Sequence, residues 1–490
     1  MRSVEDILKQ SGPSRASDLV RTLISNDVNL TPSAARQRVS RAKHPVRRLS
    51  LNLPNKERFL YLDHQLGSSE FIENLLEALE TTGSAYGRAI AGLVSRDGAV
   101  LSTHFAIASG LPIQNAKGQL RHDVVEQNLE RCDIICRSKE TDTDTEVIHF
   151  YHENGFSAKR SAALLTEDLL LGILRVWLYK TGWSSSKSIA LRSPTQVPQY
   201  GQFAWDLVGP TYLAGIRNQV DNKPQNGFIV GDIILDRRIS LRDLLPYFKK
   251  WDCLVAQRRR TRMQPIFIAD SFEEDALMEL RKRGAFVCIP EILFGEQVAK
   301  DLRDIRNTIR NAAAAITTDP NSVFDLLHRV LKIEGASLNL RGVALELMIA
   351  HLYKQDGYEI DIRQKIRANE LGAAEIDIKA RDRREVVSCE CKGMAPGVLV
   401  GKKELEKWLD TSLPRIKSWM NKQPSLPTKK RFEFYSSTDY TEDAKVLIEE
   451  TENLHKKQPV KFFNGIEILK KLRAQNMQSL VEIFKEHFKQ

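Results

Sequence analysis

The sequence predicts a multidomain protein that combines α+β and α/β architecture. The chain has 490 residues, more than one ordinary domain contains. Its composition, 42% hydrophobic and 28% charged, is typical of a globular protein with packed cores. Helical and strand-like patterns are mixed in the first 150 residues and alternate regularly after residue 157, which favours α/β domains in the second part of the chain.

Charge and cysteine usage narrow the class of protein. No apolar run is long enough to span a bilayer, and the first ten residues, MRSVEDILKQ, lack the apolar centre of a signal peptide, so we expect a cytoplasmic protein without a membrane anchor. Six scattered cysteines fit a reducing compartment, and Cys132 and Cys136 lack the second pair that would complete a zinc site. The formal net charge of +10 favours a polyanionic partner.

Residues 1–66 are expected to form the first domain. The segment SDLVRTLIS reads as a helix, and a second helix, TPSAARQRVSRAKH, begins with Thr31 as N-cap and Pro32 in the first turn. Ala35, Val39 and Ala42 share the buried face of that helix by spacing. The strands VRRLSLNL and RFLYLD then flank a turn at residues 54–56.

Two helices followed by a two-stranded wing resemble a winged-helix domain. The resemblance implies that the basic second helix enters a groove of double-stranded DNA. The candidate DNA contacts are Arg36, Arg38, Arg41 and Lys43. Two alternatives remain, because winged helices also mediate protein contacts and solvated arginines cover many ordinary helix faces.

Residues 67–153 repeat this plan more weakly and are expected to form a second winged-helix-like domain. FIENLLEALETTG is amphipathic, and DIICRS and EVIHFY flank a polar turn. The helices are less basic than those of the first domain, so a structural spacer is as good an interpretation as a second DNA reader.

Residues 154–294 alternate helices and strands and are expected to form an α/β domain. The strand candidates include FAWDLVG and GFIVGDIIL. The run Arg258, Arg259, Arg260 and Arg262 is typical of a solvated face, although it could also contact phosphates.

Residues 295–490 are expected to form a helical connector and a last α/β domain. Two of its strands, AAEIDIKA and EVVSCECK, form a hairpin if residues 382–385 are a four-residue loop. That register places Asp377 opposite Glu390, with Cβ atoms about 5 Å apart. Two adjacent carboxylates repel each other, so the pair calls for a cation, and hard oxygen ligands favour Mg²⁺ or Mn²⁺.

Glu346 adds a third carboxylate from the preceding helix. It interrupts an apolar stripe, and glutamate is rarely buried without a partner. Alternatively, Glu346 lies at the edge of the stripe and pairs with Arg341 or Lys354. Lys392, which shares a strand face with Glu390, can polarise an attacking water or stabilise the charge of a pentavalent phosphorus.

The order helix-Glu, strand-Asp, strand-Glu-x-Lys resembles the PD-(D/E)XK, or restriction-endonuclease-like, nuclease superfamily. The following FEFYSSTDYTEDA is similar to its Mrr and Holliday-resolvase branch, and the resemblance covers about residues 335–475. It implies catalytic roles for Glu346, Asp377, Glu390 and Lys392, and metal ligation by Asp377, Glu390 and the carbonyl of Cys391. Ile376 replaces the proline of the pattern, and no accessory glutamine of the Mrr type can be identified.

The third segment has the features of an inactive copy of the fourth. LYKTGW at residues 178–183 is similar to LYKQDGY at residues 352–358. Asp206 and Asp232 stand where metal ligands would be, but Ile234 stands where the lysine should be. Chance similarity of two short strings is the alternative.

Together these features predict a metal-dependent DNA endonuclease, with defence against foreign DNA as its setting. The alternatives are a structure-specific repair, recombination or transposition nuclease, and a non-catalytic DNA-binding or assembly protein that retains the nuclease fold. Because cleavage of two strands usually needs two active sites, a homodimer is a further expectation, and a protein partner or trigger stays open.

Overall fold

The computed structural model describes most of the chain, namely residues 3–51, 53, 57–80, 84–116, 118–139, 146–151, 157–185, 188–216, 218–220, 223–257, 263–311, 320–332, 338–368, 371–454 and 458–488. The chain divides into two compact units, one made of residues 1–138, 146–160 and 182–289, the other of residues 139–145, 161–181 and 290–490. The mixed α/β class and the multidomain organisation are therefore confirmed. The finer division at residues 66, 153 and 294 stays a prediction.

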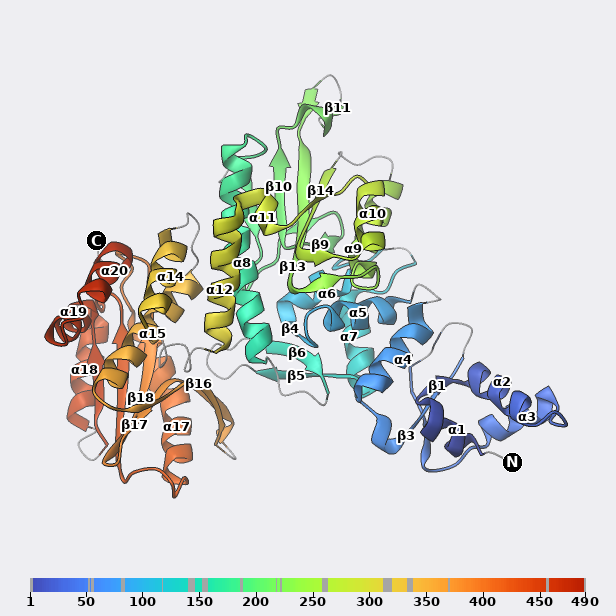
Figure 1. The fold of residues 1–490 in the computed structure, drawn as a ribbon, viewed down its shortest axis with the longest axis horizontal. Coiled ribbons are helices and arrows are strands. Elements are labelled where there is room, and N and C mark those ends of the chain that lie inside the picture. Colours follow the sequence, from blue (N-terminus) through green and yellow to red (C-terminus); the bar gives the residue numbers. More distant parts are fainter. Residues whose placement is uncertain are drawn as a thin grey trace. The chain divides into compact units, whose positions relative to one another are not determined.

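The N-terminal part of the first unit is a small bundle of helices with a three-stranded sheet of order β1-β3-β2 (Figure 1). Its elements are α1 (Val4–Ser11), β1 (Ser14–Arg15), α2 (Ala16–Asn26), α3 (Pro32–Ser40), β2 (Val46–Arg48), β3 (Phe59–Leu62) and the 3₁₀ turn η2 (Asp63–Gln65). Thr31 caps α3 as expected, with its hydroxyl accepting a hydrogen bond from the Ala34 amide.

The basic helix α3 is shorter than the sequence suggests. It ends at Ser40 rather than continuing to residue 44, so Arg41 is its C-cap and Lys43 lies beyond it. Arg48 of β2 donates hydrogen bonds to the carbonyls of Val39, Ser40 and Ala42. Two of these carbonyls belong to the last turn of α3 and the third follows it, so a guanidinium from the neighbouring strand stabilises the early end.

The next segment repeats the same order of elements. Its elements are α4 (Ser69–Glu80), α5 (Ala85–Val94), β4 (Ala99–Leu101), η3 (Ser102–His104), α6 (Phe105–Ser109), α7 (His122–Arg131), β5 (Ile135–Lys139) and β6 (Glu146–Phe150). Its sheet has the order β4-β6-β5, so the first strand pairs with the third in both segments. The repetition that the sequence indicates is thus present in the topology from α5 onward.

A five-stranded sheet of order β15-β14-β13-β10-β7 completes the first unit. The elements are β7 (Ala190–Leu191), β8 (Gln199–Tyr200), β9 (Phe203–Ala204), β10 (Leu207–Thr211), η5 (Ala214–Ile216), β11 (Asn218–Val220), β12 (Lys223–Gln225), β13 (Gly227–Ile239), α9 (Leu245–Ala256), β14 (Met263–Phe272), α10 (Glu274–Lys282) and β15 (Phe286–Cys288). The strands β7, β10 and β13 are antiparallel, whereas β13, β14 and β15 are parallel.

The second unit contains a sheet of order β16-β17-β18-β19-β20. The unit also includes most of α8 (Ala158–Lys180). Its further elements are α11 (Pro290–Phe294), α12 (Glu296–Arg310), α14 (Pro320–Lys332), α15 (Leu338–Gln355), β16 (Glu359–Arg367), β17 (Ala373–Arg381), β18 (Glu385–Lys392), α16 (Lys402–Lys407), η7 (Trp408–Ser412), α17 (Leu413–Asn421), β19 (Lys429–Ser436), α18 (Glu442–Leu454), β20 (Val460–Phe463), α19 (Gly465–Ala474) and α20 (Gln478–Phe488).

Helices cover both faces of this second sheet. Phe432 and Phe434 of β19 belong to the core that also contains residues of α16, α17 and α18. Glu433 and Tyr435 point to the opposite face, because side chains alternate along a strand, and there they contact Tyr353 of α15 and Lys471 of α19. The sheet is therefore the middle layer of a three-layer domain (Figure 1).

The two five-stranded sheets have the same topology. In each, three antiparallel strands in chain order are followed by two parallel strands, with a helix in each parallel crossover. Thus β10 and β13 correspond to β17 and β18. This correspondence supports the hypothesis that the middle segment is a copy of the last one.

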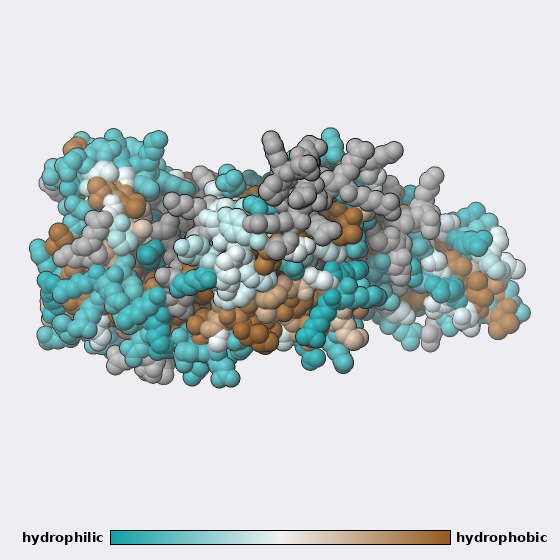
Figure 2. All heavy atoms as spheres, turned by 90° about the horizontal axis from the view of Figure 1, so that it is seen from above, coloured by the Kyte–Doolittle hydropathy of each residue, from teal (hydrophilic) through white to brown (hydrophobic). Residues whose placement is uncertain are grey.

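On the face drawn in Figure 2, hydrophobic and hydrophilic residues are interspersed. Within the described ranges, every helix is too short or too polar to traverse a membrane.

Candidate active site and basic helix

The β17–β18 hairpin has the register that the sequence predicts. Arg381 lies opposite Val386, and Ile378 lies opposite Cys389. Continued by one residue, this register sets Asp377 opposite Glu390. The Asp377 carboxylate accepts a hydrogen bond of 2.7 Å from the Cys391 amide, which fixes it beside the Glu390–Cys391 peptide.

Glu346 reaches the same place from α15. Its carboxylate receives two hydrogen bonds from the Arg363 guanidinium of β16, at 2.8 Å from Nε and 3.2 Å from a terminal nitrogen. The alternative partners Arg341 and Lys354 were wrong, because a strand that is distant in sequence supplies the cation. Arg363 has a φ of +54°, which is uncommon for residues other than glycine, and it lies in β16 between the paired residues Ile362 and Gln364.

Several carboxylates raise the pKa of Arg363. Burial disfavours the charged guanidinium, but the charge and hydrogen bonds of Glu346, with the charges of Glu375 and Asp377, raise its pKa above the usual value. Arg363 therefore stays charged and balances a cluster of acidic groups. Sequence reasoning missed it because its role depends on the fold of β16 over α15.

The same carboxylates affect the pKa of the Cys391 thiol on β18. Burial raises its pKa well above the usual value, and the charges of Asp377, Glu346 and Glu390 add to this effect. Carboxylates of three elements therefore act on this one thiol, and two of them, Asp377 and Glu390, lie on the paired strands β17 and β18. Lys392 forms an ion pair with Glu390, and its side chain is 36% exposed whereas that of Glu390 is 5% exposed.

A close backbone approach holds α15 against the end of β18. A Cβ atom on Gly393 would lie 2.4 Å from the carbonyl carbon of Arg341, so only glycine fits directly after Lys392. The first turns of α15, which lead to Glu346, are thereby set beside the strand that carries Glu390 and Lys392.

The residues present fit a hard divalent cation. Asp377 and Glu390 offer carboxylate oxygens at adjacent positions. Glu346 is near enough for its charge to raise the pKa of Cys391, as theirs do. Oxygen ligands of this kind suit Mg²⁺ or Mn²⁺. Metal ligation by Asp377, Glu390 and the Cys391 carbonyl stays a prediction, as do the catalytic roles of Glu346 and Lys392.

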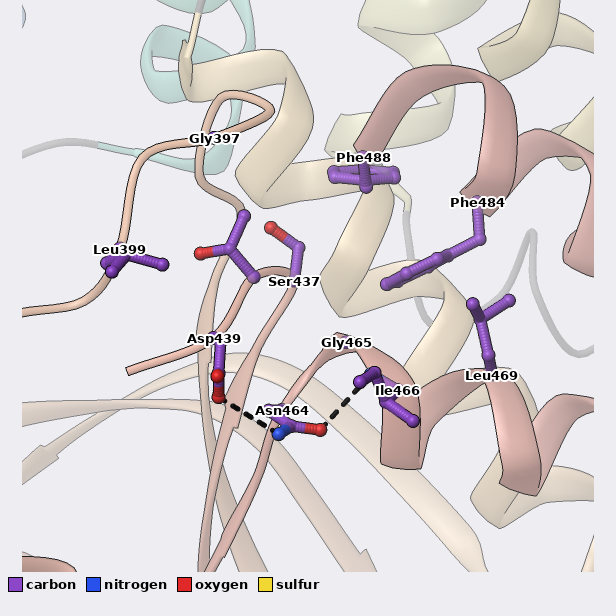
Figure 3. Close-up of a pocket in the computed structure, with 11 residues that line it drawn as sticks. Gly397, Leu399, Ser437, Asp439, Asn464, Gly465, Ile466, Leu469, Phe484 and Phe488 are labelled. Carbon is purple, nitrogen blue, oxygen red and sulfur yellow. Dashed lines mark hydrogen bonds between the residues drawn. The ribbon is translucent and has the colours of Figure 1, made fainter. Parts of the chain in front are cut away.

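A hollow of about 230 Å³ lies beyond the carboxyl ends of β19 and β20 (Figure 3). It is lined by Ser437 and Asn464 on one side and by Phe484 and Phe488 of α20 on another. The amide of Ser437 donates a hydrogen bond of 3.0 Å to the carbonyl of Lys392. The hollow is therefore a neighbour of the candidate site, but none of the four predicted catalytic residues lines it.

The middle segment contains two aspartates at positions that match Asp377 and Glu390. Leu207 lies opposite Gly231, so the continued register sets Asp206 opposite Asp232, as Asp377 is set opposite Glu390. The Asp206 carboxylate accepts a hydrogen bond of 2.8 Å from the Ile233 amide, the counterpart of the bond to the Cys391 amide. Ile234 then occupies the position of Lys392.

In the middle segment, two buried cations of the protein pair with these two aspartates. Arg192 donates a hydrogen bond of 2.7 Å to Asp206, and their side chains are 1% and 0% exposed. Lys250 of α9 is fully buried and forms an ion pair with Asp232. Burial raises the pKa of Asp232 and lowers that of Lys250, so the pair offers no exposed carboxylate to a cation from solvent.

The basic residues of the first domain are placed as follows. Arg36, Arg41 and Lys43 are exposed, whereas Arg38 is half-buried. Arg36 lines a hollow of about 1220 Å³ between α2, α3 and the β2–β3 hairpin. Arg21, Arg48 and Arg58 line it as well, and sequence reasoning missed Arg21 and Arg58 because they come from other elements.

Two further sequence features lie outside the described residues. These are the arginine run at positions 258–262 and the hairpin turn at positions 54–56.

Comparisons with known proteins give little that bears on identity. No protein-family model matches the chain, and no curated protein matches its sequence significantly. Among solved structures, it is similar to AF1548, a protein of unknown function, with a TM-score of 0.21 and 20% identity over 27% of this chain and 66% of that one. It is also similar to the restriction endonuclease FokI bound to DNA, with a TM-score of 0.23 and 12% identity over 93% of this chain and 81% of that one. Matches this distant carry no argument about activity.

Proposed function

We propose that the chain is a Mg²⁺-dependent DNA endonuclease whose active site is formed by Glu346, Asp377, Glu390 and Lys392. The observation that supports this proposal is the pairing of β17 with β18, which sets Asp377 against the Cys391 amide and beside Glu390, with Lys392 in an ion pair with Glu390. An acidic cluster of this kind is costly unless a cation balances it. Arg363 and Lys392 supply part of that balance, and a bound cation would supply the rest.

In this proposal the protein positions a water molecule and a phosphodiester. A bound metal would provide a Lewis acid for the phosphate oxygens. The Lys392 ammonium donates a hydrogen bond to the attacking water or to a phosphate oxygen, where negative charge accumulates. The water oxygen bonds to phosphorus and releases one proton to solvent. The bond from phosphorus to the 3′ oxygen breaks and the 3′ oxygen takes up a proton from solvent, so the products carry a 5′-phosphate and a 3′-hydroxyl.

The N-terminal segments are proposed to be winged-helix domains. The order helix, strand, helix, helix and hairpin, with the first strand paired to the third, supports this assignment in both copies. The first copy would contact DNA through α3, where Arg36 and Arg41 are exposed and arginines line the neighbouring hollow. The middle α/β segment would be an inactive copy, because Arg192 and Lys250 neutralise its two aspartates.

The experiment that tests this proposal compares wild type with Glu390→Ala on DNA. We expect the variant to lose Mg²⁺-dependent cleavage and to keep its affinity for DNA, since Glu390 and the basic helix belong to different compact units of the chain. Cleavage at the wild-type rate by Glu390→Ala would remove the assigned active site. Substrate panels with duplexes, junctions and phage DNA would then distinguish restriction of foreign DNA, which we propose, from repair or transposition.

A further inference from the structure

A cluster of two histidines and a glutamate lies between α14 and α20 in the second unit. One ligand atom from each of His328, Glu486 and His487 lies within 4.8 Å of the others. Nδ1 of His328 is 3.3 Å from Nε2 of His487, and the distance from His328 Nε2 to the nearer Glu486 oxygen is 3.7 Å. None of these residues belongs to the proposed nuclease site.

The distance between the two imidazoles suits ligands of one tetrahedral ion. With Zn–N bonds of about 2.0 Å, two nitrogens of a tetrahedral site are roughly 3.3 Å apart. Two imidazoles and one carboxylate are also a donor set that favours Zn²⁺ and related transition metals over Mg²⁺. Three protein ligands leave the fourth position to water, as the exposure of Glu486 allows.

Lys332 is a described cation beside the cluster. It lies 3.6 Å from the second Glu486 oxygen, but its side chain is 52% exposed and can turn into solvent. Phe484 and Phe488 of α20 are buried, so the helix is seated by its apolar face while its Glu486 and His487 face His328 of α14.

We propose that His328, Glu486 and His487 bind Zn²⁺ or a similar transition metal and thereby fasten α20 to α14. The two histidines are 159 positions apart, so one ion would link the helix before the second sheet to the last described helix. Fastening ends that are this distant in sequence restricts the unfolded chain strongly. Because Phe484 and Phe488 line the hollow beside β19, the ion would also stabilise that wall.

The test uses the full chain without an affinity tag, stripped of metal and titrated with Zn²⁺ in excess Mg²⁺. The excess Mg²⁺ occupies the proposed nuclease site, so the two sites are read separately. We expect one Zn²⁺ per chain by calorimetry, a rise in melting temperature, and the visible spectrum of four-coordinate Co²⁺ on cobalt substitution. His487→Gln and Glu486→Gln should weaken Zn²⁺ binding by at least about tenfold, as loss of a ligand does.

Glu482→Gln is the matched control, because Glu482 lies one turn earlier on α20 and is exposed. It should bind Zn²⁺ like wild type. Glu486 is half exposed, so its variant is expected to fold even if a histidine variant does not. Equal Zn²⁺ affinity in wild type and Glu486→Gln, or absence of stoichiometric binding in wild type, would show that the histidines form only a hydrogen-bonded pair.

Discussion

Substitution of Asp206 by asparagine tests whether the aspartate pair of the middle segment has a structural role, in contrast to Asp377 of the candidate active site. Asp206 and Asp377 occupy matching positions in the two sheets, and each accepts a hydrogen bond from the amide after the second acidic residue. Asp206 is paired with Arg192, and the two side chains are 0% and 1% exposed. We therefore expect Asp206→Asn to lower the stability of the protein and Asp377→Asn to lower the rate of DNA cleavage.

The size of the stability effect follows from the burial of Arg192. Asparagine keeps the shape of the side chain but removes the carboxylate charge that faces the guanidinium, which is 1% exposed. Removing one partner of a buried pair costs about 3–5 kcal/mol. At about 2–4 °C per kcal/mol for a domain of this size, the melting temperature of the first unit should fall by roughly 6–20 °C.

Differential scanning calorimetry and plasmid cleavage, made on the same preparations, measure both effects. Asp252→Asn is the control, because Asp252 lies on α9, is 54% exposed and pairs with Arg283 only at 3.7 Å. It should change stability by less than about 0.5 kcal/mol. If Asp206→Asn melts like wild type and cleaves DNA far more slowly, then the middle constellation is catalytic and its assignment as an inactive copy is wrong.

Two further predictions concern DNA binding and pH. Arg36→Ala and Arg41→Ala should each weaken DNA binding and reduce the slope of log affinity against log salt by about 0.9, as loss of one phosphate contact does; an unchanged slope would favour a protein-binding role for α3. Burial and the charge of Arg192 lower the pKa of His104 to about 3, so the unfolded state binds more protons between pH 3 and 6.5 and stability falls as the pH decreases through that range. The loss is about 2 kcal/mol at pH 5. The free energy of unfolding, measured with a chemical denaturant, should differ less between pH 7.5 and pH 5 for His104→Gln than for wild type. An equal difference in the two proteins would contradict the lowered pKa of His104.

Local patterns predicted features of both units. Alternation and loop length specified the β17–β18 register, and the capping residues Thr31 and Pro32 specified the start of α3. These features depend on residues that are close in sequence, so propensity and periodicity contain the information.

Contacts between distant residues could not be predicted in the same way. Arg363 pairs with Glu346 across 17 positions because β16 packs against α15, and Arg48 contacts the end of α3 from a neighbouring strand. Lys250 is placed against Asp232 by the packing of α9, and no spacing in the sequence indicates that it neutralises the middle constellation. Such partners follow from tertiary packing rather than from any pattern along the chain.

The central claim is that the second unit hydrolyses DNA through its carboxylates and Lys392. The most direct measurement is nicking and linearisation of supercoiled plasmid by wild type and Lys392→Ala, with Mg²⁺, with Mn²⁺ and with EDTA. We predict cleavage by wild type in either metal, none in EDTA, and a loss of at least about 100-fold in the variant, which removes a group that acts on the developing charge. Equal metal-dependent cleavage by Lys392→Ala would contradict the account.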